Sequence, residues 1–281
     1  MTMAMPAREA AILADRIEAA AFVDLFAAAP AALVARLGLT VKSVAGATAL
    51  FAPGLQTTMF NRVIGLGLDR PASAADLDAL RQDYAGTGHP NWWLHWNPHA
   101  APADGAEWLV AQGFTLPARR SWAKMLRGTA LPPAVQTTLH VASAATAQVA
   151  ATAACIAQAF GMPPLMGDWL AALHTRAQWR IYALADGADI VGGACLYIDS
   201  VAGQRTGWLG MGAVLASHRR RSGQAAAMAL RISDAVAAGC RWVATETGEA
   251  IGDEANPSLS NMRRMGFGRI ASRLNFEAAA Q

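Results

Sequence analysis

Apolar and polar positions along the chain predict an alternation of helices and short strands. Residues 7–36 carry apolar residues at helical spacing and are interrupted at Pro30. Two candidate strands, LTVKSV and ATALFAP, follow, and a longer apolar strand over residues 57–68 ends in glycines. Ser73 and Asp76 then form a capping-box pattern that predicts the start of a helix.

The rest of the first half predicts a strand, a helix and a second strand. Residues 91–97, NWWLHWN, form a strongly aromatic segment that is typical of a strand. The segment GAEWLVAQGF predicts a helix, and RSWAKMLRG predicts a strand that closes the first half. The proline pair in LRGTALPPAVQ, residues 126–136, marks a linker.

The second half begins with the candidate strand TTLHVAS, followed by expected helices over residues 144–160 and 166–176. WRIYALADG and DIVGGACLYID predict a hairpin through Asp186 and Gly187. The strand QRTGWLGMGAV, an Ala-rich helix, the strand RWVATET, a helix over NPSLSNMRRMGF and the strand RIASRLNF complete the order.

The two halves repeat one pattern, in which a helix that ends in Gly-Phe leads into a last strand. Gly113-Phe114 and Gly266-Phe267 occupy the corresponding places. We interpret this pattern as a divergent internal duplication, with a first domain over residues 1–130 and a second over residues 131–281. A coincidental α/β pattern is the alternative interpretation.

A turn with three consecutive arginines, Arg219–Arg221, follows an apolar strand that ends near Val214. Ser222 and Gly223 then open the long Ala-rich helix. The start of a helix presents unpaired backbone N–H groups and the positive end of the helix dipole, and arginines add bidentate donors. The stretch is therefore typical of a pyrophosphate clamp. The residues alone leave open a solvated basic turn that caps an ordinary helix.

This stretch resembles motif A of the GCN5-related N-acetyltransferases (GNATs), Arg/Gln-x-x-Gly-x-Gly/Ala, whose backbone amides hold the pyrophosphate of acetyl-CoA. Arg219, Ser222 and Gln224 match the motif in the preferred register, and Arg220, Gly223 and Ala225 match it one residue later. The following strand, helix, Gly-Phe and last strand extend the resemblance over residues 136–278. It implies an α+β fold, with a mixed, mostly antiparallel sheet flanked by helices, that is present twice.

The resemblance implies which residues bind acetyl-CoA as co-substrate, and it implies no metal. These residues are Met211, Gly212, Ala213, Val214, Arg219, Arg220, Arg221, Ser222, Gly223, Gln224 and Asn256. Gly210 and Gly212 inside a strand indicate either a bulge or a close backbone approach, or a simple relief of packing. His218 is expected to order the turn or to contact a phosphate, with a role as base as the alternative.

Transfer of an acetyl group to an amine needs a base, and the best candidate is Glu246 on the strand RWVATET. The alternative is a strand-end glutamate in solvent or paired with an arginine. The tyrosine that usually acts as acid in the family is replaced by Met262, and Ser258, Ser260 and Asn261 are the nearby polar candidates. Asn256 either contacts CoA or caps the last helix.

The first half lacks an arginine turn and carries Asp69-Arg70-Pro71 at the corresponding place. We therefore expect it to bind no CoA and to complete the acceptor pocket or to stabilise the second half. The aromatic cluster in this half could line an acceptor site or a domain interface, and we favour the interface. The cluster comprises Trp92, Trp93, Trp96 and Trp108. In the second half, Met162, Met166 and Trp169 are candidates for an apolar acceptor wall, with helix packing as the alternative.

Composition narrows the class of protein. The 281 residues are 54% hydrophobic and 15% charged, and no apolar run approaches the roughly 18 residues of a membrane span. Acidic residues interrupt the apolar N-terminal stretch, which argues against a secretory signal. Three cysteines without metal-like spacing favour a reduced, cytoplasmic protein. A net charge of +3 gives no indication of nucleic acid.

The sequence thus predicts a cytoplasmic tandem N-acetyltransferase, monomeric or homodimeric, that moves an acetyl group directly to a primary amine. The acceptor is a small molecule, peptide or protein, and neither a membrane nor a nucleic acid is expected as partner. An acyl-CoA-binding regulatory or assembly module without turnover is the alternative. Nucleic-acid binding by the arginine turn is a weaker third hypothesis, because three arginines make a small footprint.

Overall fold

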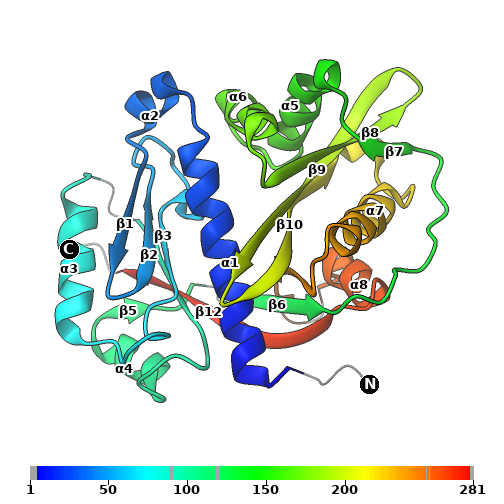
Figure 1. The fold of residues 1–281 in the computed structure, drawn as a ribbon. Helices are drawn as coiled ribbons and strands as arrows, with labels where there is room; N and C mark the ends of the chain where they lie inside the picture. The colour runs from blue at the N-terminus through cyan, green and yellow to red at the C-terminus, as the bar shows by residue number, and fades with distance from the viewer. Residues whose placement is uncertain (1–4, 89–90, 118–120, 251, 253, 279–281) are drawn as a thin grey trace.

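The computed structural model describes residues 5–88, 91–117, 121–250, 252 and 254–278, and its strands form one continuous sheet (Figure 1). The first-half strands are β1 (Thr40–Val44), β2 (Ala47–Phe51), β3 (Arg62–Ile64), β4 (Trp93–Trp96), β5 (Phe114–Thr115) and β6 (Ser121–Arg127). The second-half strands are β7 (His140–Ser143), β8 (Trp179–Asp186), β9 (Asp189–Val201), β10 (Gln204–Val214), β11 (Trp242–Gly248) and β12 (Gly268–Ala278).

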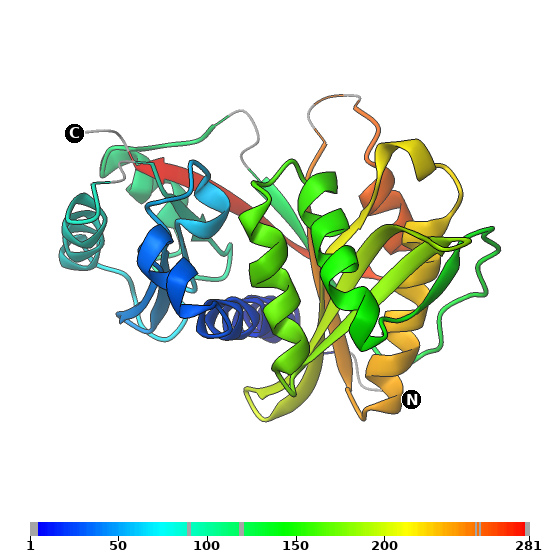
Figure 2. The ribbon, with the colours of Figure 1, turned by 90° about the horizontal axis from the view of Figure 1, so that it is seen from above.

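Helices flank this sheet. They are α1 (Ala7–Ala27), α2 (Ala31–Leu37), α3 (Ala74–Ala85), α4 (Gly105–Ala111), α5 (Val149–Ala159), α6 (Leu165–Ala172), α7 (Gly223–Ala237) and α8 (Pro257–Arg264). Short 3-10 turns are η1 (Thr58–Phe60), η2 (Thr146–Gln148), η3 (Leu173–Thr175) and η4 (Ala216–His218). Figures 1 and 2 show α3 and α7 at opposite ends of the molecule, with α1 between them.

The closing strands of the two halves are exchanged. The order along the sheet is β1-β2-β3-β4-β12-β6-β11-β10-β9-β8-β7. β6 comes from the first half of the sequence but pairs antiparallel with β11 and β12. β12 runs past β6 and pairs with β4 and β5 through residues 274–278. Each half therefore completes its part of the sheet with a strand that the other half supplies.

This exchange changes the expected role of RSWAKMLRG, which forms β6 but lies among the strands of the second half. Arg120, at the start of that expected strand, lies outside the described residues. The division of the chain at residues 130 and 131 stays a prediction, and the backbone pairing of the sheet runs across it.

Helix α1 packs against strands of both halves because it is apolar on nearly all sides. Leu13, Ile17 and Leu25 are buried, and α1 contacts β1 and β2 as well as β9, β10 and β11. The indole Nε1 of Trp169 on α6 donates a hydrogen bond of 2.7 Å to the backbone carbonyl of Leu25. The helix therefore joins the two halves into one core.

Most of the expected elements are present, including the hairpin between β8 and β9 and the capping box of Ser73 and Asp76. The long strand expected over residues 57–68 is wrong, because only β3 and the turn η1 form there. Gly65 and Gly67 adopt φ angles of +90° and +82°, which a continuing strand does not allow.

No single helix in the described ranges is long and apolar enough to span a membrane, although α1 and α2 together reach the required length and composition across a bend of 106°. The three cysteines are buried and free of disulfide bonds. Burial raises the pKa of the Cys195 thiol to about 12.

Candidate active site

β10 and β11 run side by side and then part. They pair in parallel only from Thr206–Trp242 to Trp208–Ala244. The two residues that follow Gly210 form a bulge in the pairing of β10 with β9. The first of them, Met211, has a φ of +53°. Bulges bend a strand and leave backbone groups unpaired. The parting strands therefore open a gap in the sheet along residues 211–214.

A buried arginine supports the bulge from the α7 side. Arg231 is 2% exposed, and its guanidinium donates hydrogen bonds to the carbonyls of Cys195 at 2.9 Å and Gly210 at 3.1 Å. Burial lowers the pKa of Arg231 to about 10, so the side chain stays charged at neutral pH. The carbonyl of Leu209 accepts a further bond from the hydroxyl of Thr245. These contacts fix the backbone where the strands part.

Gly210 leaves room for a tryptophan to lie across the strand. A Cβ at this position would come within 2.0 Å of the Trp208 ring. The indole Nε1 of Trp208 donates to both carboxylate oxygens of Glu246 at 3.1 Å. The expected bulge is thus present and includes Gly212, whereas Gly210 relieves packing against the Trp208 ring, as the alternative interpretation had it.

The arginine turn leads directly into the N-terminus of α7. Arg220 and Ser222 adopt the left-handed φ angles of +63° and +59°, and the first helical hydrogen bond runs from Ala226 N–H to the Ser222 carbonyl. The N–H groups of residues 223–225 precede that bond and need other partners. Gly223 lies against Leu139, because a Cβ would come within 2.7 Å of its side chain. The turn can therefore bind an anion at a helix N-terminus.

The three arginines of the turn serve different contacts. Arg219 and Arg220 line a cavity of about 560 Å³. Arg221 instead forms a bidentate pair with Asp186, at 2.6 and 3.0 Å, and donates to Thr138. The hydrogen bonds from Arg221 hold the pKa of the Asp186 carboxyl below its usual range. The Arg221 side chain is thus occupied away from the cavity that its two neighbours line.

A second cavity, of about 380 Å³, continues from the first. The two share Phe160, Gly212 and Gln224, and together they connect the arginine turn with Glu246. We call the second cavity the acceptor chamber. The residues that line it are Phe22, Met59, Phe60, Trp122, Phe160, Met162, Trp208, Leu209, Gly210, Met211, Gly212, Gln224, Met228, Arg231, Thr245, Glu246, Thr247, Gly248, Ser258 and Met262.

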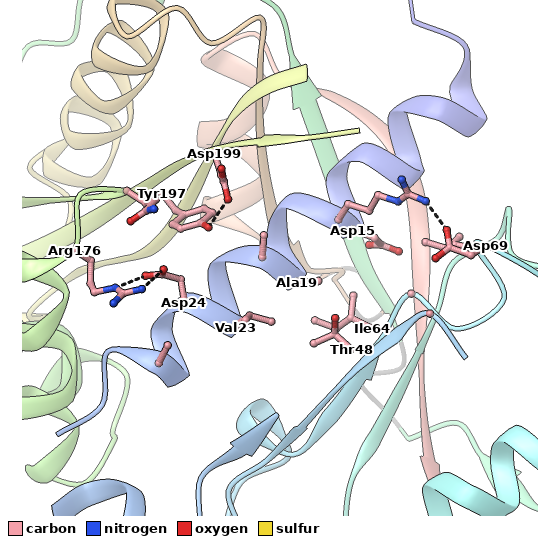
Figure 3. Close-up of a pocket in the computed structure, with 17 residues that line it drawn as sticks. Asp15, Ala19, Val23, Asp24, Thr48, Ile64, Asp69, Arg176, Tyr197 and Asp199 are labelled. Atoms are coloured by element: carbon pink, nitrogen blue, oxygen red, sulfur yellow. Dashed lines mark hydrogen bonds and ion pairs between the residues drawn. The ribbon is translucent and has the colours of Figure 1, made fainter. Parts of the chain in front are cut away.

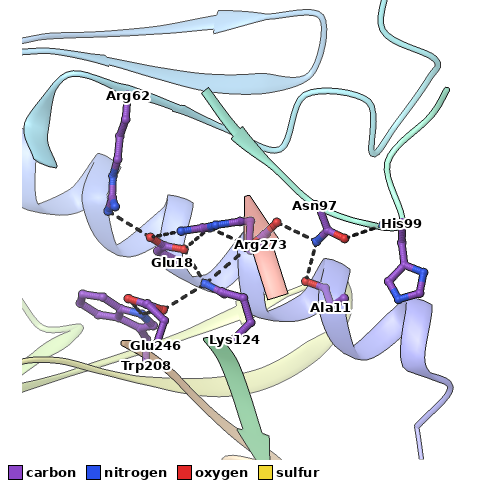
Figure 4. A network of polar contacts seen from close by, with 10 residues as sticks. Ala11, Glu18, Arg62, Asn97, His99, Lys124, Trp208, Glu246 and Arg273 are labelled. Carbon is purple, nitrogen blue, oxygen red and sulfur yellow. Dashed lines mark hydrogen bonds and ion pairs between the residues drawn. The ribbon is translucent and has the colours of Figure 1, made fainter. Parts of the chain in front are cut away.

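Glu246 lies at the edge of a buried charge network (Figure 4). Its carboxylate pairs with the Lys124 ammonium at 3.0 Å, and Lys124 pairs in turn with Glu18 at 2.5 Å. Arg273 and Arg62 also pair with Glu18, at 2.5 and 3.0 Å. The network is thus built from α1, β3, β6, β11 and β12, and it ties the carboxylate of the chamber to both halves.

Burial and the negative charge of Glu18 raise the pKa of the Glu246 carboxyl above its ordinary value. Glu18 behaves in the opposite way. Burial alone would raise its pKa, but Arg273, Lys124 and Arg62 hold the pKa of Glu18 well below its ordinary value. The pKa values of the two carboxyl groups therefore differ in opposite directions from the ordinary value, and Glu246 is the one that binds a proton more readily.

The polar candidates on α8 divide into three cases. Ser260 is exposed and lies outside the residues that line the two cavities, whereas Ser258 lines the chamber. Asn261 lines the first cavity and donates to the side-chain oxygen of Gln224 at 3.2 Å. Asn256 caps α8 by accepting from Leu259 N–H at 2.9 Å. The geometry therefore gives no support to a catalytic Ser260 and favours the capping role of Asn256.

Only some of the other residues expected at the acceptor side line the chamber. Met162 lines the chamber, but Met166 and Trp169 are buried in the packing of α6. Trp92 and Trp96 lie in a core of the first half, and Trp108 packs against it. Of the chamber's tryptophans, neither Trp122 nor Trp208 was singled out from the sequence.

Sequence reasoning also missed Lys124, the ion-pair partner of Glu246, because β6 was expected to close the other half. A signal was present in α1, where Asp15 and Glu18 interrupt an apolar helix on one face. Charged side chains on a buried helix face need partners of opposite charge. They are both fully buried here, and both pair with Lys124 and Arg273.

A third cavity, of about 520 Å³, borders α1 near β2 and β9 (Figure 3). Its charged side chains all have partners: Asp15 pairs with Lys124 and Arg273, Asp199 accepts from the Tyr197 hydroxyl, and the other four pair with one another. Arg176 pairs with Asp24 at 2.6 Å, and Arg16 pairs with Asp69 at 2.5 Å. We therefore place the candidate active site in the other two cavities. The described part of the chain holds no group of three His, Cys, Asp or Glu side chains arranged for a metal ion.

The corresponding junction of the first half is closed by its own side chains. At the start of α3, the Asp76 carboxylate accepts the backbone N–H of Ser73 at 2.9 Å and pairs with Arg70 at 2.6 Å. Ala101 N–H donates to the Gly67 carbonyl at 2.8 Å, which covers the end of β3. A carboxylate of the chain itself thus occupies the place that an anion would take.

Comparison with solved structures shows the fold. A GCN5-related N-acetyltransferase from Kribbella flavida is 18% identical, with a TM-score of 0.63 over 95% of this chain and 96% of that chain. One from Sphaerobacter thermophilus is 18% identical, with a TM-score of 0.57 over 82% and 79%. A tandem GNAT protein from the clavulanic acid biosynthesis pathway is 14% identical, with a TM-score of 0.61 over 84% and 78%.

No family model and no curated protein matches the sequence. The structural likeness covers most of the chain and includes a tandem protein. The chain therefore has the fold of the GCN5-related N-acetyltransferases in a two-domain arrangement, and the fold class expected from the sequence is confirmed.

Proposed function

We propose that this chain, which has the fold of the GCN5-related N-acetyltransferases, transfers an acetyl group from acetyl-CoA to a primary amine. The continuous groove from the arginine turn, along the open strand β10, to the buried carboxylate of Glu246 carries this proposal. In the reaction the amine nitrogen bonds to the thioester carbonyl carbon, the C–S bond breaks, the amine proton passes to a base, and CoA leaves as thiolate.

The arginine turn suits the pyrophosphate of acetyl-CoA. Arg219 and Arg220 line the first cavity, and the N–H groups of residues 223–225 begin α7 beside it. Guanidinium groups and helix N-termini both bind phosphate oxygens. We assign the side chains of Arg219 and Arg220 to this role, together with the backbone from Ser222 to Gln224. Arg221 contributes by fixing the turn on Asp186.

The open edge of β10 suits the amide-containing arm of acetyl-CoA. Met211, Gly212, Ala213 and Val214 lie where β10 has left β11, so their backbone groups on that side can pair with an extended ligand. Gly212 and Gln224 border both cavities, and an arm that passes them would reach from the turn to the chamber.

Glu246 is the proposed base. A base works best when its pKa is close to the working pH, and burial raises the pKa of this carboxyl in that direction. Trp208 and Lys124 hold the carboxylate in place through bonds of 3.1 and 3.0 Å. Proton acceptance requires the ionised carboxylate, so turnover should fall as the pH falls through this raised pKa.

Calorimetric titration of acetyl-CoA into the wild type and into Arg219→Ala/Arg220→Ala tests the proposal. We expect one site in the wild type. Each hydrogen bond to a charged group contributes about 1.5–3 kcal/mol, so the double variant should bind about a hundredfold more weakly or worse. Arg263→Ala is the control, because Arg263 is an exposed arginine outside the lining of both cavities, and it should keep the affinity within a few-fold.

Equal affinity in the wild type and the double variant would refute the clamp. A second site would show that the first half also binds acetyl-CoA, contrary to the closed junction at α3.

The alternative function is an acyl-CoA-binding module without turnover. It is favoured by one observation, because Met262 lines the chamber where the family resemblance places a tyrosine acid. The variant Glu246→Gln separates the two functions. General bases contribute about 10²–10⁴-fold, so turnover should fall by at least about a hundredfold while acetyl-CoA affinity is retained.

The pH profile sharpens this test. In the wild type, the acidic limb of kcat/KM should lie above the ordinary glutamate pKa of about 4.3, and it should vanish in Glu246→Gln. Unchanged turnover in the variant would remove Glu246 from the base role.

A further inference from the structure

The first half of the chain supplies part of the wall of the acceptor chamber. Phe22 comes from α1, Met59 and Phe60 from η1, and Trp122 from β6. The exchange of closing strands places Trp122 beside the strands of the second half, because Trp122 pairs with Gly248 of β11. The chamber is therefore a joint product of the two halves.

This wall is held rigidly. Phe22 packs edge-on against Trp208 with ring centroids 5.7 Å apart, and its other ring neighbour is Phe60 at 6.2 Å. The buried guanidinium of Arg62 lies over the rings of Phe22 at 4.0 Å and Trp122 at 5.5 Å. Cation–π and edge-to-face contacts fix the orientation of aromatic rings. A ligand thus meets preformed aromatic surfaces.

The rest of the lining is also mainly apolar. Five methionines line the chamber together with Phe160, and they are Met59, Met162, Met211, Met228 and Met262. Methionine sulfurs make favourable contacts with aromatic rings and adapt to their shape. The volume of about 380 Å³ is in the range of pockets that enclose one small molecule.

The charges around the chamber do not favour a polycation. Glu246 is the one carboxylate among the described lining residues, and Lys124 already pairs with it at 3.0 Å. Arg231 adds a positive charge that is bound to backbone carbonyls. A chain of ammonium groups would lose its hydration here without gaining ion pairs in return.

We infer that the acceptor is a primary amine on an aromatic or similarly flat apolar body, and that the first half of the chain recognises that body. This inference rests on the proposed acetyl transfer and names its substrate class. Glu246 is the group placed to meet the amine end, and the wall of Phe22, Met59, Phe60 and Trp122 is placed to meet the body.

The test compares 2-phenylethylamine with putrescine as acceptors, at saturating acetyl-CoA, in the wild type and in Trp122→Ala and Met59→Ala. Both side chains are half-buried, so these variants disturb the fold less than changes at Phe22 or Phe60. Trp108→Ala is the control, because Trp108 is a half-buried first-half tryptophan that packs on Trp96 outside the chamber.

We expect kcat/KM for 2-phenylethylamine to exceed that for putrescine in the wild type. It should fall about tenfold in Trp122→Ala through a higher KM, which is the scale of lost apolar contact in a specificity pocket. Acetyl-CoA affinity should stay unchanged in all three variants. A preference for putrescine, or equal loss in Trp108→Ala, would overturn the inference.

Direct titration of 2-phenylethylamine into the protein separates this inference from the proposed function. If acetyl-CoA fails to bind, the proposed function is wrong, and binding of the amine still decides whether the chamber accepts an aromatic body. If acetyl-CoA binds but 2-phenylethylamine neither binds nor is acetylated, the inference on substrate class is wrong and the proposed function stands.

Discussion

The two halves of the molecule contain the same junction, a strand that leads into a helix, in two different states. At the start of α3, Ser73 and Asp76 form a reciprocal capping box, and Arg70 neutralises the carboxylate. At the start of α7, the cap residue Ser222 makes no side-chain hydrogen bond to the helix, and two arginines line the adjoining cavity. A helix N-terminus is thus available to an outside anion only where the chain leaves it uncapped.

The strands before these helices also differ, because the end of the first is paired and the end of the second is open. β3 has three residues and pairs in parallel with β4 up to its last residue, Ile64, opposite His95. β10 has eleven residues, parts from β11 after Trp208, and carries the bulge. The second half therefore combines an open helix end with an open strand edge, and the first half has neither.

The closed half is nevertheless joined to the proposed site. Its strand β6 brings Lys124 to Glu246 and Trp122 to the acceptor chamber. Its helix α1 brings Glu18, whose negative charge adds to the effect of burial in raising the pKa of Glu246. The first half has no open anion site, but it still contributes residues to the proposed site of the second half, because the strand exchange gives the two halves one shared core.

Among changes at the two helix starts, the largest expected effect comes from making the second junction resemble the first. Gln224 lies in the first turn of α7 and borders both cavities. Gln224→Glu keeps the side-chain shape but adds a negative charge, as Asp76 does in α3. The helix N-terminus tolerates that charge, while the pyrophosphate of acetyl-CoA is repelled. We expect acetyl-CoA affinity to fall by about tenfold or more at low salt, measured by calorimetry.

The matched control is Gln224→Met, which also removes the weak donation from Gln224 to the Gly212 carbonyl at 3.5 Å but adds no charge. The difference in acetyl-CoA affinity between the two variants should shrink as the salt concentration rises from about 0.01 to 1 M, because the Debye length falls to about 3 Å. Equal affinity in both variants at low salt would mean that the groove does not hold a polyanion beside Gln224.

The sequence allowed much of this comparison to be predicted. Helical spacing, the capping box of Ser73 and Asp76, and the Gly-Phe endings are local signals, and the structure contains each of them. The proline and acid after GLGL indicated a closed first junction, and the arginines an open second one. These features depend on neighbours within a few residues, which is why the pattern of the chain reveals them.

The strand exchange could not be predicted in the same way. β6 and β12 both have the pattern of a strand, but periodicity does not say which part of the sheet a strand joins. The partner of Glu246 and the first-half wall of the chamber both depend on that choice. The different roles of the three arginines also depend on a residue far away in the sequence, because Arg221 is held by Asp186 on the hairpin of β8 and β9.

The smallest expected effect is on stability, and it contrasts the two cap residues. Ser73→Ala removes a side chain that bonds with Asp76, and loss of such a cap costs about 0.5–2 kcal/mol. Ser222→Gly removes no cap bond and relieves a left-handed φ of +59°, a conformation that costs a residue with a Cβ about 1–2 kcal/mol. Greater freedom of glycine in the unfolded chain offsets about 0.5–1 kcal/mol of that gain.

Urea midpoints should therefore fall for Ser73→Ala and stay level or rise slightly for Ser222→Gly, and hydrogen exchange should quicken in the first turn of α3 alone. A loss in Ser222→Gly as large as that in Ser73→Ala would show that α7 is capped by its own serine, and the contrast between a closed and an open junction would fail.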